Sequence, residues 1–173
     1  MSAAFSIRLA QPKEYQAIGQ LMVQVYSSLE GFPQPDEHPT YYHKLAHVGE
    51  LAQKDGIDLL VAVNEDGAIG GAVVYFHDIT LYGARGVADH EENAGAFRLL
   101  AVDPATRGQG LGRQLIQACL NTAKETGKSQ VVIHSTQAMQ VAWGMYERLG
   151  FVRAQSLDFD QNGFPIFGFR LTL

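Results

Sequence analysis

One segment, Ala96–Ile116, constrains the fold more than any other part of the chain. Its apolar first part is broken at Asp103-Pro104, because a residue that precedes proline is pushed out of the helical region. Three glycines at alternate positions follow, Gly108, Gly110 and Gly112, and a helical pattern of apolar residues comes after them. The predicted order is strand, glycine loop and helix, with the loop at the helix N-terminus.

This loop has the features of a phosphate site. The first turn of a helix leaves backbone N–H groups without partners, and the helix dipole makes that end partly positive. Glycines carry no Cβ, so a phosphate can approach the backbone closely. Arginines on either side add charged donors. The residues predicted to hold a pyrophosphate are Arg107, Gly108, Gln109, Gly110, Leu111, Gly112 and Arg113.

Two common nucleotide sites do not match this loop. A P-loop has Lys-Ser or Lys-Thr after its last glycine, whereas Gly112 is followed by Arg113-Gln114. A dinucleotide fingerprint spaces its glycines by one and then two residues and has an acidic residue about twenty residues later. Here the glycines alternate regularly, and the segment from Gln130 to Ser135 has no acid. Both readings fail on spacing.

The segment resembles the acetyl-coenzyme A signature of the GCN5-related N-acetyltransferases. The resemblance lies in Arg107-x-x-Gly110-x-Gly112, preceded by a strand and by Val-Asp-Pro. A second segment, Tyr146-Glu-Arg-Leu-Gly-Phe151, resembles the Tyr-x-x-x-Gly-Phe of the same family. The two segments occur at the expected separation, and the predicted order of elements is similar over nearly the whole chain.

Composition agrees with an ordinary globular protein of 173 residues, which we expect to form one acetyltransferase-like domain, 1–173. The formal net charge of −5 argues against a nucleic-acid partner held through its phosphates. The single cysteine, Cys119, falls in the helix after the loop and is expected to be a core thiol. We see no secretory leader and no apolar run of about 18 residues, so we expect no membrane contact and a cytoplasmic location.

Periodicity and turn residues predict the remaining elements. The chain should begin with a strand at 5–10 and a helix at 12–28, followed by a loop at 30–39. The later elements are a helix at 40–54, a hairpin at 58–63 and 68–76, a strand or irregular segment at 77–88, strands at 94–102 and 130–135, helices from 111 to about 126 and at 137–149, and a final hairpin at 151–159 and 164–173. This order predicts an α/β fold, and the resemblance implies a mixed, mostly antiparallel sheet with a splayed central parallel pair flanked by helices.

The resemblance also implies where the donor would bind. Strands 97–102 and 131–135 would separate, and the pantetheine arm of acetyl-coenzyme A, the co-substrate, would lie between them. Separated strands leave backbone groups unpaired, and the arm's amides would satisfy those of Leu99, Leu100, Ala101 and Val102. A backbone N–H near Leu100 would face the oxyanion. No metal is expected.

Direct attack by an amine needs an acid for the thiolate and a base for the ammonium. Tyr146 matches the family's tyrosine acid. For the base, Glu92 is the first carboxylate candidate and Glu91 the second, with His134 or a water chain as alternatives. One departure is Met139, which stands where many members have an asparagine that contacts the cofactor, and this leaves the cofactor geometry near the tyrosine open.

The acceptor is not readable from the chain. By the resemblance, Phe32, Tyr41, Tyr42 and His43 would line its pocket, together with His134. A small amine, an amino acid, a peptide N-terminus and an antibiotic all remain open, as does a homodimer. We also considered His43 and His47 as a metal pair with Glu37 or Glu50, but surface or pocket histidines explain this spacing better.

The first functional hypothesis is therefore an acetyl-coenzyme A-dependent N-acetyltransferase that acts on a primary amine. The alternative is a non-catalytic domain on the same fold that binds or senses acyl-coenzyme A. A third hypothesis is transfer to a hydroxyl or from a longer acyl donor.

Overall fold

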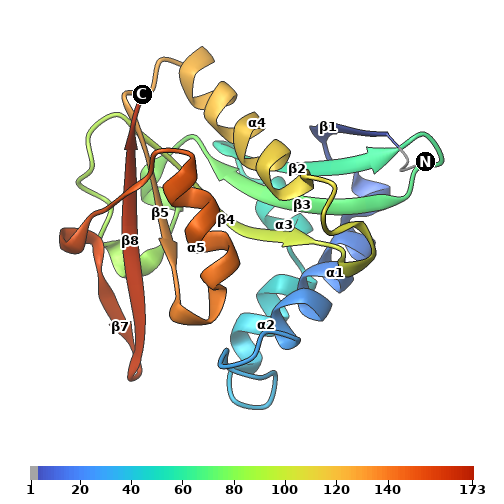
Figure 1. The fold of residues 1–173 in the computed structure, drawn as a ribbon, viewed down its shortest axis with the longest axis horizontal. Coiled ribbons are helices and arrows are strands. Elements are labelled where there is room, and N and C mark those ends of the chain that lie inside the picture. The colour runs from blue at the N-terminus through green and yellow to red at the C-terminus, as the bar shows by residue number, and fades with distance from the viewer. Residues whose placement is uncertain (1–3) are drawn as a thin grey trace.

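The computed structural model describes residues 4–173, which form an eight-stranded sheet and five α-helices (Figure 1). The sheet order is β1-β2-β3-β4-β5-β8-β6, and β7 pairs with β8 outside this path. The strands are β1 (Phe5–Leu9), β2 (Ile57–Asn64), β3 (Ile69–Phe76), β4 (Ala94–Val102), β5 (Gln130–Ser135), β6 (Val152–Arg153), β7 (Phe159–Gln161) and β8 (Phe164–Thr172). All pairs are antiparallel except β4 with β5, which is parallel.

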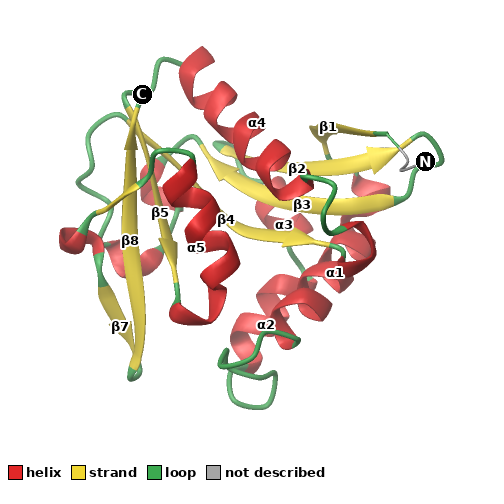
Figure 2. Cartoon of the chain, viewed as in Figure 1, coloured by secondary structure: helices red, strands yellow, loops and turns green. Residues whose placement is uncertain are grey.

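The helices cover both faces of the sheet, so the core has two parts (Figure 2). One face packs against α1 (Tyr15–Ser27), α2 (Pro39–Ala46) and α3 (Gly49–Ala52), and the other against α4 (Leu111–Glu125) and α5 (Gln140–Arg148). We call these the α1 face and the α4 face. The predicted mixed sheet with a central parallel pair is confirmed. Within residues 4–173, no helix has the length and apolarity that crossing a membrane requires.

Two glycines of β3 let α4 approach the sheet closely. A Cβ on Gly70 would lie 2.6 Å from Leu111 Cδ1, and one on Gly71 would lie 3.0 Å from Leu115 Cδ1. Cys119 is fully buried in this interface, as expected, and burial raises the pKa of its thiol. A buried thiol that stays protonated is a core residue, because the thiolate is the nucleophilic form.

One predicted element is wrong in detail, and an open alternative is decided. The helix expected at 40–54 divides into α2 and α3, because His47 has non-helical angles and Gly49 lies where a Cβ would be 2.5 Å from the Tyr15 ring. For the segment 77–88, which was expected to be a strand or irregular, the structure has the irregular form, with two short 3-10 helices, Ile79–Leu81 and Ala84–Gly86.

The last hairpin also differs from the prediction. Its first strand is interrupted between β6 and β7 by a 3-10 turn, Gln155–Leu157, which places Leu157 in the core. Gly168 on β8 makes room for this turn, because a Cβ there would lie 2.3 Å from Leu157 Cβ. The Asn-Gly closure is confirmed: Asn162 and Gly163 both have positive φ, 53° and 87°, as a type I′ turn requires.

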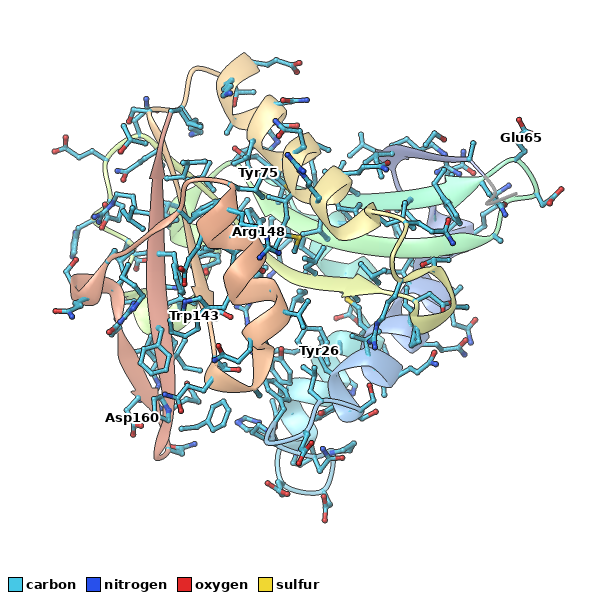
Figure 3. All side chains as sticks on the ribbon, in the orientation of Figure 1. Tyr26, Glu65, Tyr75, Trp143, Arg148 and Asp160 are labelled. Carbon is cyan, nitrogen blue, oxygen red and sulfur yellow. The ribbon has the colours of Figure 1, made fainter. Side chains whose placement is uncertain are left out.

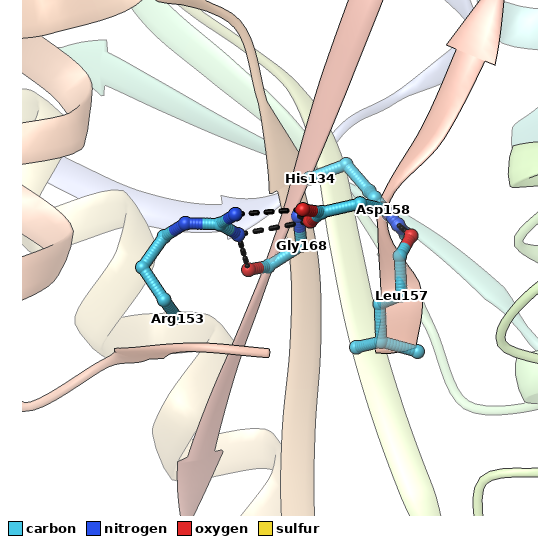
Figure 4. Close-up of polar contacts among 5 residues, drawn as sticks. All are labelled: His134, Arg153, Leu157, Asp158 and Gly168. Carbon is cyan, nitrogen blue, oxygen red and sulfur yellow. Dashed lines mark hydrogen bonds and ion pairs between the residues drawn. The ribbon is translucent and has the colours of Figure 1, made fainter. Parts of the chain in front are cut away.

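An ion pair fastens this turn to the sheet (Figure 4). The Arg153 guanidinium donates to both carboxylate oxygens of Asp158, at 2.9 and 2.7 Å, and the Gly168 N–H donates to the same carboxylate at 2.7 Å. The guanidinium also lies over the rings of Trp143, Phe167 and Phe169. These contacts hold the Asp158 carboxyl ionised and lower its pKa.

Asp158 should therefore contribute stability that disappears in acid. A carboxyl whose folded pKa is depressed stabilises the fold above its unfolded pKa of about 3.9 and loses this contribution as the pH falls through the folded value. We expect Asp158→Asn to cost about 1–3 kcal/mol of unfolding free energy near neutral pH. Urea denaturation of both proteins should show the difference shrinking below about pH 4. A difference that stays constant between pH 6 and pH 3 would contradict this role.

The crossing of α1 and α2 gives a second test of stability. A Cβ on Gly19 would lie 2.2 Å from the Ala46 carbonyl oxygen, a backbone atom that cannot move independently. Gly19→Ala should therefore destabilise the protein by about 1–3 kcal/mol, although alanine favours helices. The control is Gly112→Ala in α4, whose Cβ would meet ordinary contacts from 3.5 Å outward. Equal thermal midpoints for the two variants would refute the close approach.

Candidate functional site

The site is built where β4 and β5 separate. They pair only through Ala94 with Gln130, Gly95 with Val131 and Ala96 with Val132. Beyond this point Figure 1 shows the two halves of the sheet diverging, with β1–β4 running across the view and β5 and β8 running down it. We call the space between the two strands beyond Ala96 and Val132 the gap.

Polar side chains hold the paired ends together. Gln130 Nε2 donates to the Glu92 carbonyl oxygen at 2.9 Å and to the Glu91 carboxylate at 3.3 Å. Glu91 also pairs with Arg170 of β8, and the Ser129 N–H donates to the Asn93 carbonyl oxygen at 3.0 Å. These contacts fix the paired ends of β4 and β5, and the two strands separate from there.

A β-bulge turns β4 at the gap. Leu99 and Leu100 together oppose the single Val73 of β3, and Leu99 has a φ of 60°. A leucine in this left-handed region costs roughly 1–2 kcal/mol, a strain that proteins concentrate at functional sites. In the described sheet neither β3 nor β5 pairs with these two residues. The Leu100 carbonyl is bound instead by the Tyr26 hydroxyl of α1, at 3.1 Å.

Two buried hydroxyls lie at the end of β5. Ser135 Oγ and Thr136 Oγ1 have no hydrogen-bond partner among the described residues, although both residues are buried. Ser135 lies on the same face of β5 as Ile133, toward α5, because side chains alternate along a strand. A buried hydroxyl without a partner costs free energy, so a ligand in the gap would relieve this cost.

The glycine loop presents a row of free backbone donors. Along residues 108–113, no N–H group donates to any acceptor in the described part of the chain. Gly108 and Gly110 have φ of 83° and 78°, which favours glycine, and Gly110 caps α4. Thr106 Oγ1 fixes the loop to β3 by donating to the Gly70 carbonyl oxygen at 3.0 Å. The predicted cradle thus has the donors that a phosphate needs, with Arg107 and Arg113 exposed beside it.

Tyr146 reaches the sheet from α5. Its ring packs against Phe97, Phe151 and Phe169, with centroids 5.8 to 6.3 Å away. Within residues 4–173 its hydroxyl has no hydrogen-bond partner, although the residue is only 6% exposed. Burial raises the pKa of Tyr146, so the hydroxyl keeps its proton and is available as a donor.

On the α1 face a groove runs between the α1–α2 loop and the last hairpin. It consists of two adjoining hollows of about 410 and about 300 Å³, which share Glu30, Gly31 and Phe164. Edge-on and tilted aromatic contacts continue from the groove toward β4, from Phe164 to Phe32 and then to Tyr41 and Tyr26. In Figure 3, Tyr26 lies in the view between α5 and α1. Because Tyr26 bonds to Leu100, this aromatic wall joins the groove to the gap.

The other predicted pocket residues do not face this groove. The Tyr42 hydroxyl donates to the Pro33 carbonyl oxygen at 2.7 Å and so holds the loop. His43 is exposed, and its ring stacks on that of His47 at 4.1 Å. In the part of the chain that the structure describes, no group of three or more His, Cys, Asp or Glu side chains is placed to hold a metal ion.

His134 lies on the α1 face with both ring nitrogens engaged. Nε2 is 2.7 Å from the Leu157 carbonyl oxygen, which can only accept, so Nε2 carries the proton. Burial lowers the pKa of His134 and keeps the ring neutral, so Nδ1 accepts from the Tyr82 hydroxyl at 2.8 Å. A ring held in this way has no free nitrogen that could bind the substrate amine.

Glu92 lies at the wrong end of β4 to act on a substrate in the gap. It precedes Ala94, and a strand rises about 3.3 Å per residue, so the first residue of β4 is already roughly 20 Å from Leu100. Its neighbour Glu91 is held by Arg170. Neither carboxylate reaches the gap, and the expectation that one of them is a direct base is therefore not supported by the geometry.

Sequence reasoning did not single out three residues that lie at the gap, Tyr26, Ser135 and Arg98. Tyr26 and Ser135 look like ordinary core positions, because their roles depend on the bulge and on strand separation. Arg98 gave a signal, since it is the only charged residue in the strand that runs from Ala94 to Val102.

Comparison with curated proteins finds partial matches. A mycothiol acetyltransferase from Gordonia bronchialis is 38% identical over 73 residues, which are 42% of this chain and 24% of that protein. N-alpha-acetyltransferase 30 from Schizosaccharomyces pombe is 36% identical over 63 residues, 36% of this chain and 42% of that protein. The chain thus spans less than half the length of these relatives.

Solved structures share the fold over nearly the whole chain. A GCN5-related N-acetyltransferase from Kribbella flavida superposes with a TM-score of 0.74 at 18% identity, covering 98% of each chain. The structure of yncA from Salmonella typhimurium with its cofactor acetyl-CoA gives a TM-score of 0.67 at 18% identity, covering 98% of this chain and 94% of that one.

The acetyltransferase (GNAT) family model matches residues 20–151, which include the glycine loop, the gap and Tyr146. The protein is therefore a member of the acetyltransferase (GNAT) family.

Proposed function

We propose that the protein is an acetyl-coenzyme A-dependent N-acetyltransferase that acts on a primary amine, with residues 1–173 as one catalytic domain. The observation that carries this proposal is the run of unbonded backbone N–H groups along 108–113 at one end of the gap. N–H groups that can bind an anion, placed beside two separated strands, match a co-substrate such as acetyl-coenzyme A. It has a pyrophosphate at one end and an amide-containing arm at the other.

The residues present fit such a donor. The glycine loop would hold the pyrophosphate, with Arg107 and Arg113 neutralising charge. The unpaired edge from Leu99 to Val102 would bond the arm. The hydroxyls of Ser135 and Thr136 are buried donors that still need partners, and they lie where β5 ends. They also offer polar contacts near Met139, where the family resemblance implies an asparagine.

In the proposed reaction, the catalytic acid lies on one face of the gap and the amine enters from the other. Acetyl-coenzyme A supplies the acetyl group as a thioester. The bulge turns backbone near Leu100 toward the gap, where an N–H would stabilise the negative charge that develops on the acetyl oxygen. Tyr146, on the α4 face, would donate its proton to the departing sulfur.

The amine would approach from the α1 face through the groove. Glu30 and Glu37 line it, so the local field favours an ammonium group. Because His134 has no free nitrogen and Glu92 lies far from the gap, we assign proton removal to water in the groove.

The alternative, a domain that binds acyl-coenzyme A without turnover, predicts affinity without thiol release. The free Tyr146 hydroxyl favours the enzyme, because a sensing domain has no need for an unbonded acid beside the gap.

Removing the Tyr146 hydroxyl tests the assigned acid. Tyr146→Phe keeps the ring packing and should lower kcat by roughly 10²–10⁴-fold, with coenzyme A affinity changed less than about twofold. Thiol release and calorimetric titration measure the two effects. The matched control is Tyr75→Phe on β3, which removes a buried hydroxyl that has no hydrogen-bond partner in the described chain. If both variants turn over at the wild-type rate, Tyr146 is not the acid.

Two glycines with the same backbone conformation, at opposite ends of α4, test the cradle. Gly110 at the N-terminus and Gly127 at the C-terminus have φ of 78° and 75°, so alanine strains both by roughly 1–2 kcal/mol. Gly110→Ala should weaken coenzyme A binding at least about tenfold, since it disturbs the N–H row. Gly127→Ala should lose similar stability and keep its affinity. Equal affinities for the two variants would exclude the loop as the phosphate site.

A further inference from the structure

Arg98 is a half-buried cation without a counter-charge. Four arginines in residues 4–173 are half-buried, and three of them have carboxylate partners: Arg8 pairs with Glu14, Arg153 with Asp158, and Arg170 with Glu91. Arg98 forms no ion pair with any residue of the described chain. A partly desolvated charge is costly unless it is paired, so this exception needs a cause.

The hydrogen bonds of Arg98 within the protein do not explain why its charge is unpaired. Arg98 Nη1 donates to the Tyr82 carbonyl oxygen at 3.0 Å, and the guanidinium carbon lies 5.9 Å from the Tyr82 ring centroid. A guanidinium has five N–H donors, and this is its single hydrogen bond to the described residues. The cation–π contact with Tyr82 offsets part of the charge and uses none of the remaining donors.

The groups around Arg98 are neutral at pH 7. Burial raises the pKa of Tyr26, of Tyr82 and of Tyr41, the last to about 12, and lowers the pKa of His134. Of these four, Tyr82 contacts Arg98 directly, and the positive charge of Arg98 also acts on the pKa of Tyr26, Tyr41 and His134. The carboxylate that acts on His134, Asp158, is already paired with Arg153.

Strand register places this cation beside the reaction. Arg98 on β4 and His134 on β5 each stand two residues beyond the last paired residues, Ala96 and Val132, and so face the α1 side of the gap. Tyr82 spans this side, since its carbonyl bonds to Arg98 and its hydroxyl to His134. Leu100, the proposed oxyanion position, is only two residues, roughly 7 Å, further along β4.

We infer that Arg98 binds an anionic group of the acceptor, so that the acceptor is an amine that carries a carboxylate a few bonds away, as an amino acid does. This inference rests on the proposed N-acetyltransferase function and names its substrate class. The planar guanidinium matches a carboxylate through paired donors, which a lysine ammonium does not. With the carboxylate on Arg98, the amine projects toward Leu100 and the gap.

The test compares free amino acids with their carboxamides, which keep the amine and the skeleton and lose the charge. Thiol release from acetyl-coenzyme A is measured for the full chain with both sets. The wild type should prefer the acids by about 10- to 100-fold in kcat/KM, the range for hydrogen bonds to a charged group. Equal or better use of the carboxamides would overturn the inference and leave the proposed function intact. If no amine in either set is acetylated, the inference fails, and thiol release with amines that have no amino-acid skeleton then decides the proposed function separately.

Variants locate the preference in Arg98. Arg98→Gln should raise KM for the acid about 10- to 100-fold and change kcat/KM for its carboxamide less than about twofold. Arg98→Lys keeps the charge and loses the paired, planar N–H donors of the guanidinium. Its KM for the acid should lie between those of the wild type and Arg98→Gln. Arg148→Gln, an exposed arginine on α5, is the control and should behave as wild type. A uniform loss on acid and carboxamide, with an unchanged thermal midpoint, would assign Arg98 a general role and refute carboxylate binding.

Discussion

The separation of β4 from β5 determines the rest of the site. A parallel pair normally satisfies its backbone along its whole length, but here the pairing ends at Ala96 and Val132 while both strands continue. The bulge at Leu99 and Leu100 maintains the separation on one side, and the Tyr26 hydroxyl occupies one of the carbonyls that are set free. The other unpaired groups give this region its capacity to bind a ligand, because buried polar groups require partners.

Two further features depend on this opening. The gap lets helices on opposite faces contribute to one small volume, so that Tyr146 from α5 and the aromatic wall next to α1 approach the same backbone. The buried, unbonded hydroxyls of Ser135 and Thr136 also lie beside this opening, beyond Val132, the last residue of β5 that pairs with β4. The strain at Leu99 is thus balanced by a site that a regular sheet does not provide.

The sequence predicted the donor side of the site better than the acceptor side, for a physical reason. The glycine loop and Tyr146 depend on local patterns: alternating glycines at a helix start, and a tyrosine at a fixed distance from Gly-Phe. The groove depends on segments far apart in the chain, such as Phe32 against Phe164, and spacing carries no information about such contacts. His134 and Glu92 were expected near the substrate from their chemical type; in the structure both ring nitrogens of His134 are hydrogen-bonded, and Glu92 precedes the paired end of β4.

The same division bears on specificity. The donor would be bound mainly by backbone groups, which the fold positions whatever the side chains are. The acceptor would be read by side chains on the α1 face, and these can change without disturbing the loop or the bulge. Among them Arg98 differs from the apolar residues of its strand in carrying a charge that nothing in the described chain neutralises. Because an uncompensated, partly buried charge lowers stability, its presence is best explained by what binds to it.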